Sequence, residues 1–314
     1  MLSRTAGSLF WLARYMERAE NVARILTVGD RMASLAHSLG NTGNEWLSTL
    51  RAAGCEDGFF AQHGAANGTE VIHYMVADAN NPSSIFSCLE TARRNARAVR
   101  TALTTDMWEA LNQTWMRLRD LDQSAVVTEA LPDFLDWVKE RSLLFNGAYA
   151  NTMLRNDAFS FMRLGTFIER ADSTARILDV KYHVLLPRGE GVGGALDYYQ
   201  WQAILRSVSA LRSYHWVYQE RLKPWLVAEL LILRHEMPRS LRAAMEQVVL
   251  HLDLLAGAYG GKQGECHRLA GEMHARLRYG RTEDIFQSGL HEFLVAFISH
   301  IAQLGSEISD LYLM

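Results

Sequence analysis

The chain has 314 residues, a length that suits one large domain or two ordinary ones and can bury a sizeable core. Hydrophobic residues make up 49% and charged residues 21%, which excludes an intrinsically disordered chain. The 32 basic and 35 acidic residues leave a net charge of -3, which does not indicate a nucleic-acid-binding protein.

The cysteines and the apolar stretches bear on the compartment. Cys55, Cys88 and Cys266 are far apart and form no CxxC pair, a usage typical of reduced cytoplasmic thiols. The N-terminus lacks the apolar core and cleavage site of a signal peptide. The most apolar stretches, 224–233 and 293–301, are shorter than the roughly 20 residues of a membrane span. We expect a cytoplasmic protein with no membrane partner.

Helical periodicity extends along almost the whole chain. In chain order, the predicted helices are 5–37, 46–53, 70–79, 83–103, 106–122, 133–154, 157–185, 197–222, 225–236, 239–258, 263–279 and 284–312. Prolines lie at the breaks, and Ser83 and Ser240 are candidate helix caps. The glycine clusters 54–68, 189–194 and 257–264 are predicted loops. Because no segment has strand alternation with a hairpin turn, the sequence predicts an all-α fold.

The chain contains an internal repeat. Segment 10–28 aligns without a gap with segment 162–180, so that Glu17-Arg18-Ala19 recurs as Glu169-Arg170-Ala171. Further matches follow in the same order: Trp46 with Trp201, Leu50-Arg51 with Leu205-Arg206, 81–85 (NPSSI) with 237–241 (MPRSL), and Phe134-Leu135 with Phe293-Leu294. Several matches in one order indicate a duplication. We predict one helical domain over 1–314, a bundle in which copies 1–154 and 155–314 are related by a pseudo-two-fold axis.

The repeated Glu-Arg segment carries most of the candidate functional residues. On a helical wheel of the first copy, apolar side chains fill one broad arc. Arg14, Glu17, Asn21 and Arg24 lie on the opposite side, with Glu20 at one edge of the arc. The wheel therefore predicts a polar face that bears these five side chains.

Arg18 falls inside the apolar arc, and Arg170 takes the same phase in the second copy. A buried guanidinium requires a partner, because an isolated buried charge is prohibitive. One interpretation is structural: Glu169 pairs with Arg18, and Glu17 pairs with Arg170, across the pseudo-axis.

The other interpretation is a ligand site. Five arginines could converge on a carboxylate or phosphate, whose geometry the guanidinium fork matches: Arg14, Arg18, Arg24, Arg170 and Arg176. Glu20, Asn21 and Asp172 are further candidates for binding. Glu17 and Glu169 are candidate general acids or bases. A closed Glu-Arg lattice would favour the structural role, whereas a cleft beside an unpaired Glu17 would favour catalysis.

These segments resemble the bacterial Alpha-E family, named for a predicted α-helical domain with a Glu-Arg motif. The resemblance covers essentially the whole chain and is most specific in 2–24 and 152–187, with support from 81–100. The family's marked positions correspond to Ser3, Arg4, Trp11, Arg14, Tyr15, Glu17, Arg18, Glu20, Asn21, Glu169, Arg170, Asp172 and Arg176. Thr166 stands where the first copy has Arg14, so the two copies are not equivalent.

The resemblance implies an accessory role in bacterial peptide-modification systems. The family is encoded beside, or fused to, a circularly permuted ATP-grasp protein, and a transglutaminase-like protease often joins them. We therefore expect a helical partner of an amide-bond-forming ligase that binds the enzyme or an acidic peptide substrate. The alternative is a stand-alone helical enzyme in which arginines hold a carboxylate substrate.

Other chemistry has little support in the sequence. ExxH occurs only at Glu70–His73, whereas a di-metal helical bundle needs two such motifs. The glycines of 189–194 follow a predicted helix instead of a strand, the wrong context for a dinucleotide fingerprint. We predict no metal and no cofactor. Most tryptophans lie at apolar helical phases and are expected in the core, although some could form a partner surface.

Overall fold

The fold is entirely helical in the part of the chain that the computed structural model describes, residues 1–38, 45–121, 126, 130–183 and 194–313. The first half contains α1 (Ser3–Ser38), α2 (Glu45–Ala53), α3 (Glu56–Phe60), α4 (Gly68–Val76), α5 (Ile85–Ala98), the 3₁₀ turn η1 (Arg100–Ala102), α6 (Thr105–Arg119) and α8 (Leu131–Thr152). The second half contains α9 (Asp157–His183), α10 (Ala195–Ser207), α11 (Leu211–Tyr218), α12 (Pro224–Ile232), α13 (Leu241–Ala258), α14 (Glu265–Tyr279), α15 (Thr282–Ser288), α16 (Leu290–Ile308) and the π-helical turn η2 (Ser309–Leu313). The predicted all-α class is confirmed.

Two predicted helices are each divided by a residue in the left-handed region. The segment predicted as 197–222 forms α10 and α11, with Ser209 between them at φ 58°. The segment predicted as 284–312 forms α15 and α16, which meet at Gly289 with φ 91°. A positive φ cannot continue a right-handed helix. Periodicity continues across both breaks, so it did not reveal them.

One predicted loop contains a helix. Segment 54–68 was expected to be a loop because of its glycines, yet α3 lies inside it. Its Phe59 is fully buried, with its ring 5.3 Å from that of Tyr74. Burial of this aromatic side chain stabilises a turn of helix that composition alone does not indicate. The predicted loop 189–194 lies outside the described residues except for Gly194.

Serine caps begin corresponding helices of the two halves. Ser240 caps α13 by accepting a hydrogen bond from the backbone N–H of Ala243, at 3.0 Å. In the first half the cap of α5 is Ser84, which accepts from the N–H of Ser87 at 3.1 Å. The prediction that Ser83 caps this helix is wrong by one residue. Ser83 instead lies just before the helix, where its side chain lines a cavity described below.

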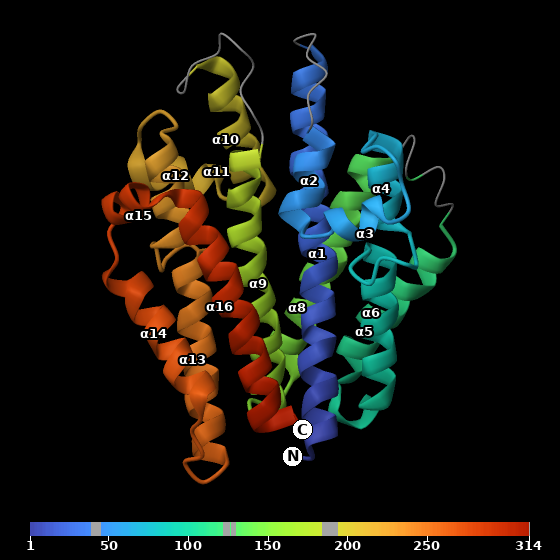
Figure 1. The fold of residues 1–314 in the computed structure, drawn as a ribbon. Coiled ribbons are helices and arrows are strands. Elements are labelled where there is room, and N and C mark those ends of the chain that lie inside the picture. Colours follow the sequence, from blue (N-terminus) through green and yellow to red (C-terminus); the bar gives the residue numbers. More distant parts are fainter. Residues whose placement is uncertain (39–44, 122–125, 127–129, 184–193, 314) are drawn as a thin grey trace.

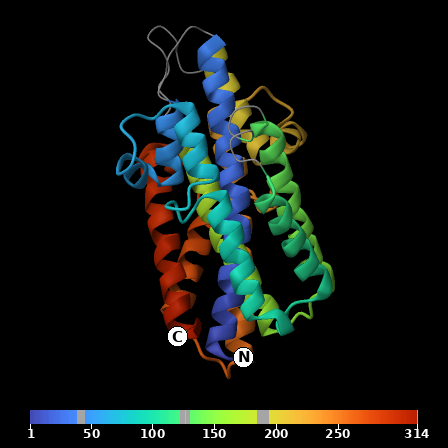
Figure 2. The same cartoon turned by 90° about the vertical axis from the view of Figure 1, so that its right-hand side faces the viewer.

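Helices α1 and α9 form the centre of the bundle. They pack along each other, with the other helices of the first half around α1 and those of the second half around α9 (Figure 1). A Cβ atom added to Gly165 on α9 would lie 2.3 Å from the backbone oxygen of Phe10 on α1. A glycine is therefore required at this point, where α9 packs directly against the backbone of α1. The ends of the chain lie together at one end of the bundle (Figure 2).

The two halves have corresponding packing partners. Helix α5 packs on α1 as α13 packs on α9, and α8 contacts α1 as α16 contacts α9. Helices α2 and α10 also correspond, because each packs on the central helix of its own half and on that of the other half. This arrangement is what a duplicated unit with a shared centre would give, although the pseudo-two-fold axis and the domain boundaries stay predictions.

None of the described helices, taken singly, combines the length and apolarity needed to cross a membrane. Only α15 together with 290–313 passes such a test, as a pair bent by 97°.

Candidate functional site

The Glu-Arg motifs of the two central helices pair crosswise. Arg18 donates from Nη2 to Oε2 of Glu169 at 3.0 Å, and its Nε donates to Oε1 of the same carboxylate. Arg170 donates from Nε and Nη2 to the two oxygens of Glu17, each at 2.9 Å. These are the two pairs that the structural interpretation predicted. Each is bidentate and joins α1 to α9.

One pair is part of a closed cluster, defined by Glu17, Glu20, Arg24, Arg170 and Arg239. Arg239, which precedes α13, donates from Nη1 to Glu17 at 3.3 Å and from Nη2 to Glu20. Glu20 also accepts from Nε of Arg24 at 2.9 Å. The hydroxyl of Ser142 on α8 donates to the other Glu20 oxygen at 2.6 Å. Both carboxylates are therefore fully buried among donors.

The other pair is part of an open cluster, defined by Arg14, Arg18, Glu169, Asp172 and Arg176. Arg14 donates from Nε to Oε2 of Glu169 at 2.9 Å, so two guanidinium groups share this carboxylate. Arg176 donates from Nε to Oδ2 of Asp172 at 2.7 Å. Asp172 accepts no further hydrogen bond from the described part of the chain.

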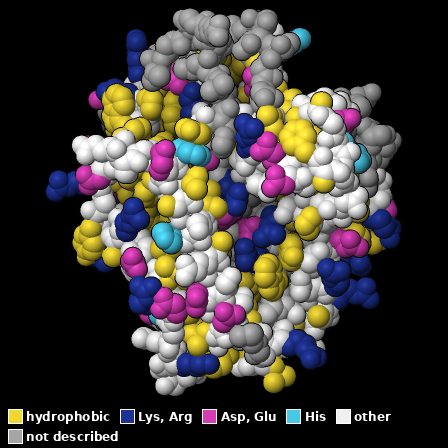
Figure 3. All heavy atoms as spheres, viewed as in Figure 1, with side chains coloured by type: hydrophobic (Ala, Val, Ile, Leu, Met, Phe, Trp, Pro, Cys, Tyr) yellow, Lys and Arg dark blue, Asp and Glu magenta, His cyan; other side chains and the backbone are white. Residues whose placement is uncertain are grey.

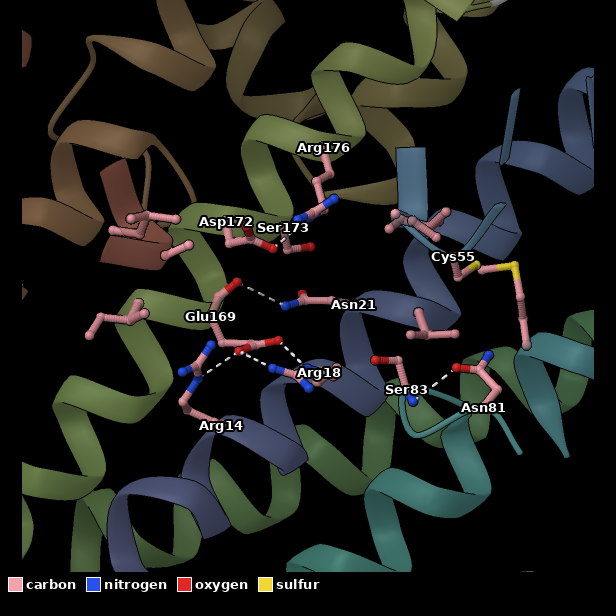
Figure 4. A pocket seen from close by; sticks show the side chains of 18 residues that line it. Arg14, Arg18, Asn21, Cys55, Asn81, Ser83, Glu169, Asp172, Ser173 and Arg176 are labelled. Atoms are coloured by element: carbon pink, nitrogen blue, oxygen red, sulfur yellow. Dashed lines mark hydrogen bonds and ion pairs between the residues drawn. The ribbon is translucent and has the colours of Figure 1, made fainter. Parts of the chain in front are cut away.

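The open cluster faces a cavity of about 280 Å³. Its walls come from α1, α2 and the turn after it, α4, α9, α16 and the segment before α5, and all five residues of the open cluster line it. Figure 4 shows Arg14, Arg18 and Glu169 on one side, Asp172 and Arg176 on another, and Ser83 and Cys55 opposite α9. On this face of the molecule, basic and acidic side chains gather around a central hollow (Figure 3). The volume is close to the lower end of small-molecule pockets, about 300 Å³.

The sequence repeat explains why only one cluster is open. In the alignment of 81–85 with 237–241, Ser83 corresponds to Arg239. Continuing the match of Phe134 with Phe293 along the helix places Ile301 opposite Ser142. The two side chains that complete the closed cluster are thus replaced by a short serine and an aliphatic residue, and both line the cavity. No arginine therefore takes the position of Arg239 beside the open cluster, and the cavity lies there.

Two buried polar atoms at this cavity have no hydrogen-bond partner among the described residues, Oδ1 of Asn21 and Oγ of Ser173. Asn21 donates from Nδ2 to the backbone oxygen of Glu169 at 3.3 Å, which leaves its carbonyl oxygen unused. Both residues line the cavity and are more than nine-tenths buried. Because a buried polar group without a partner is costly, this pair indicates that a ligand or water completes the site.

The pKa values of Glu169 and Glu20 are lowered in this environment. Burial alone would raise the pKa of Glu169, but the charges of Arg18 and Arg14 lower it to about 2. Burial would likewise raise the pKa of Glu20, but the charges of Arg239 and Arg24 outweigh burial and lower this pKa to about 2. A general acid or base works best with a pKa near the working pH. Glu169 is therefore suited to holding arginines in place, not to proton transfer.

Asp172 behaves in the opposite way to its counterpart Glu20. Burial raises the pKa of Asp172, the charge of Glu169 raises it further, and Arg176 and Arg14 do not offset the two. Among the described residues, no group of three His, Cys, Asp or Glu side chains is placed to hold a metal ion.

The structure separates the predicted site residues into two sets. It brings Arg14, Arg18, Asn21, Asp172 and Arg176 to one cavity with Glu169, whereas Glu17, Glu20, Arg24 and Arg170 belong to the closed cluster. The predicted convergence of all five arginines on one anion is therefore not found.

The polar face predicted for α1 is not a solvent-exposed face. Glu17, Glu20, Asn21 and Arg24 are buried, whereas 22% of the Arg18 side chain is exposed. Helix α1 is surrounded by other helices, so its charged side chains meet partners and not solvent. Arg239, Ser142 and Ser83 were missed, although the mismatch of Ser83 with Arg239 was visible in the repeat.

Comparison with known proteins places the chain in a family. Residues 1–313 match the Alpha-E family, described as a predicted alpha-helical domain with a conserved ER motif, and the chain belongs to this family. It is 26% identical over 335 residues to Uncharacterized protein Mb2597 of Mycobacterium bovis and to Uncharacterized protein MT2643 of Mycobacterium tuberculosis. These matches cover 98% of this chain but 36% of each relative. No solved structure matches the chain significantly.

Proposed function

We propose that this protein is a helical binding partner in an ATP-grasp-linked system that makes amide bonds, and that its cavity binds a carboxylate of the peptide substrate. The observation that carries the proposal is the open cluster. Three guanidinium groups, those of Arg14, Arg18 and Arg176, face one cavity that holds only two carboxylates. When both carboxylates are ionised, one positive charge is left for an anionic group of a ligand.

The arginines are held ready for such a group. Arg14 lies over the ring of Trp11, with its guanidinium carbon 4.7 Å from the ring centroid, and Arg18 lies 5.3 Å from that of Tyr15. Together with Glu169, these rings fix the direction in which each guanidinium points. Pre-organised arginine forks bind carboxylates with little loss of side-chain entropy.

The partner role has separate support. The chain spans about a third of the length of the mycobacterial relatives that it matches, so in those proteins the same domain is joined to other sequence. On this chain, Trp216 of α11 is 84% exposed and Trp225 of α12 is 49% exposed, unlike the core position expected of most tryptophans. Exposed tryptophans are typical of protein–protein contacts. We assign this surface to the ligase, with a transglutaminase-like protease as a second candidate partner.

The catalytic alternative has weaker support. Glu17 lies in the closed cluster, bonded to Arg170 and Arg239, and does not line the cavity. Glu169 lines the cavity but is occupied by Arg14 and Arg18. By the criterion set out from the sequence, a closed lattice around Glu17 favours a binding protein over an enzyme.

The test is a tagged pull-down from the native host with mass spectrometry of the co-purifying proteins. We expect an ATP-grasp protein. The purified pair is then assayed for ATP-dependent amide formation with the intact chain and with Ser83→Arg, which fills the cavity as Arg239 fills the closed cluster. The matched control is Asn80→Arg, which adds the same charge at an exposed position nearby. Equal activity of all three pairs would remove the cavity from the mechanism, and purification of the chain alone would contradict the partner role.

A further inference from the structure

We propose that the cavity recognises an α-amino acid residue with an apolar side chain, through both its free carboxylate and the nitrogen on its α-carbon. A free amino acid and the C-terminal residue of a peptide share this chemistry. The inference rests on the proposed function, because it uses the same cavity. It adds a second half to the site, in which protein acceptors receive hydrogen bonds from the ligand nitrogen.

The carboxylate half is formed by guanidinium edges that the cluster itself does not use. Arg18 bonds Glu169 through Nε and Nη2, so Nη1 has no acceptor among the described residues. Arg14 uses only Nε for the same carboxylate. Arg14 and Arg18 lie at the cavity wall on successive turns of α1, on either side of the Glu169 carboxylate (Figure 4). A ligand carboxylate that accepts from both would neutralise the excess positive charge.

The nitrogen half is formed by acceptors that lack donors. Oδ1 of Asn21 is a buried acceptor without a partner, and Ser173 beside it has an unpaired hydroxyl. Asp172 next in sequence uses only Oδ2, toward Arg176. An amide carbonyl and a carboxylate can accept hydrogen bonds but not donate them. A ligand that satisfies them directly, without an intervening water, therefore carries N–H or O–H groups as well as an anion.

The closed cluster shows what fills the equivalent place. There, Glu20 receives hydrogen bonds from Arg239 and Ser142 in addition to Arg24. Its counterpart Asp172 has Ser83 and Ile301 in those positions, and the space between them is part of the cavity. A cationic ligand nitrogen at this point would take the place of the Arg239 guanidinium. A simple anion such as phosphate, which offers mainly acceptors, would leave these oxygens unpaired.

The remaining wall of the cavity determines which ligand side chain it accepts. Val22 and Ile25 from α1, Ile168 from α9, Ile301 from α16 and Met75 from α4 give the cavity an aliphatic part. A second charge on the ligand would be desolvated there without a partner. A cavity of about 280 Å³ suits one residue of this kind.

The test measures binding of four probes to the intact protein by calorimetry: L-leucine, 4-methylpentanoate, L-leucinamide and N-acetyl-L-leucine. 4-Methylpentanoate lacks the nitrogen of leucine, and L-leucinamide lacks the carboxylate. We expect leucine to bind at least roughly tenfold more tightly than both. N-acetyl-L-leucine keeps the carboxylate and one N–H, as a peptide C-terminus does. Tighter binding of this probe than of leucine identifies the peptide terminus as the source, and weaker binding identifies the free amino acid.

Variants assign the two halves. Asp172→Asn is expected to reduce the affinity for leucine toward that for 4-methylpentanoate, without weakening the binding of 4-methylpentanoate. Ser83→Arg should abolish the binding of leucine and of 4-methylpentanoate, whereas Asn80→Arg should abolish neither. If 4-methylpentanoate binds the intact protein as tightly as leucine, the inference is wrong while the carboxylate site of the proposed function stands. If leucine, its acetyl derivative and 4-methylpentanoate all fail to bind, both this inference and the carboxylate site of the proposed function are wrong. The probe series requires no variant, so poor folding of Asp172→Asn would not prevent the decision.

Discussion

The open and closed clusters carry the same charges around the same two central helices, yet only the open cluster faces the cavity. Each contains three arginines and two carboxylates, and each makes one crosswise bidentate pair between α1 and α9. Each also bonds a backbone oxygen at the equivalent place: Arg24 donates to Ser207, and Arg176 donates to Ala52 at 3.5 Å. The difference lies outside the Glu-Arg motif, in Arg239 and Ser142 against Ser83 and Ile301.

This comparison suggests that the structural and the ligand-binding role of the Glu-Arg motif belong to different clusters. The closed cluster satisfies its charges internally, which is the requirement for a buried structural network. The open cluster keeps the crosswise pair but lacks the groups that would complete it. We propose that, after a duplication, the closed cluster holds the helices together while the open cluster binds a ligand. The predictions below test that division, beginning with the largest expected effect.

Arg239→Met should be the most destabilising change. It removes the guanidinium that bridges Glu17 and Glu20, leaving two buried carboxylates with too few partners. Loss of one partner from a buried ion pair costs about 3–5 kcal/mol. The free energy of unfolding from urea denaturation measures it. The matched change in the open cluster, Arg176→Met, should cost clearly less, because Asp172 and the cavity are accessible to water. Equal losses would contradict the division of roles.

How far the sequence predicts this arrangement depends on the number of helices involved. The crosswise pairs could be predicted, because Arg18 and Arg170 occupy the same phase of repeated helices and a buried arginine needs a carboxylate. The burial of Glu17 and Arg24 could not be predicted, because a helical wheel describes one helix and does not show that other helices surround it. Arg239 lies more than 200 residues from Glu17, and only the fold brings them together.

Gly165→Ala should disturb both clusters together. The added Cβ would lie 2.3 Å from the backbone oxygen of Phe10, so α1 and α9 would have to separate. Overpacking of this kind costs about 1–3 kcal/mol. The control is Gly147→Ala in α8, where no atom lies within 4 Å of the new Cβ and removal of a helical glycine should stabilise by about 0.5–1 kcal/mol. Thermal unfolding of both variants provides the measurement, and a neutral Gly165→Ala would show that the interface is not tightly constrained.

The equivalent carboxyls Glu20 and Asp172 should affect stability with opposite pH dependence. The pKa of Glu20 is lowered to about 2, so its stabilising effect is complete above its ordinary value of 4.5 and is lost as the pH falls toward 2. The pKa of Asp172 is raised, so its ionisation costs stability, and that cost disappears as the pH falls through its raised pKa.

Urea denaturation at several pH values between 7 and 3 tests this contrast. The stability advantage of the intact protein over Glu20→Gln should shrink as the pH falls. Relative to Asp172→Asn, the intact protein should instead gain stability. Parallel curves for the two variants would show that Arg239 and Ser142 do not distinguish the two carboxyls.

The smallest effect is a difference in chemical reactivity. Arg176 and Arg18 have 26% and 22% of their side chains exposed, against 5% for Arg24 and 10% for Arg239. Limited treatment with phenylglyoxal, followed by peptide mass spectrometry, should therefore modify the first two before the second two. In Ser83→Arg, the new guanidinium should fill the cavity and bring the rates at Arg18 and Arg176 down to those of the closed cluster. Unchanged rates in that variant would mean that Ser83 is not what keeps the cluster open, and that the sequence difference between the copies has another structural consequence.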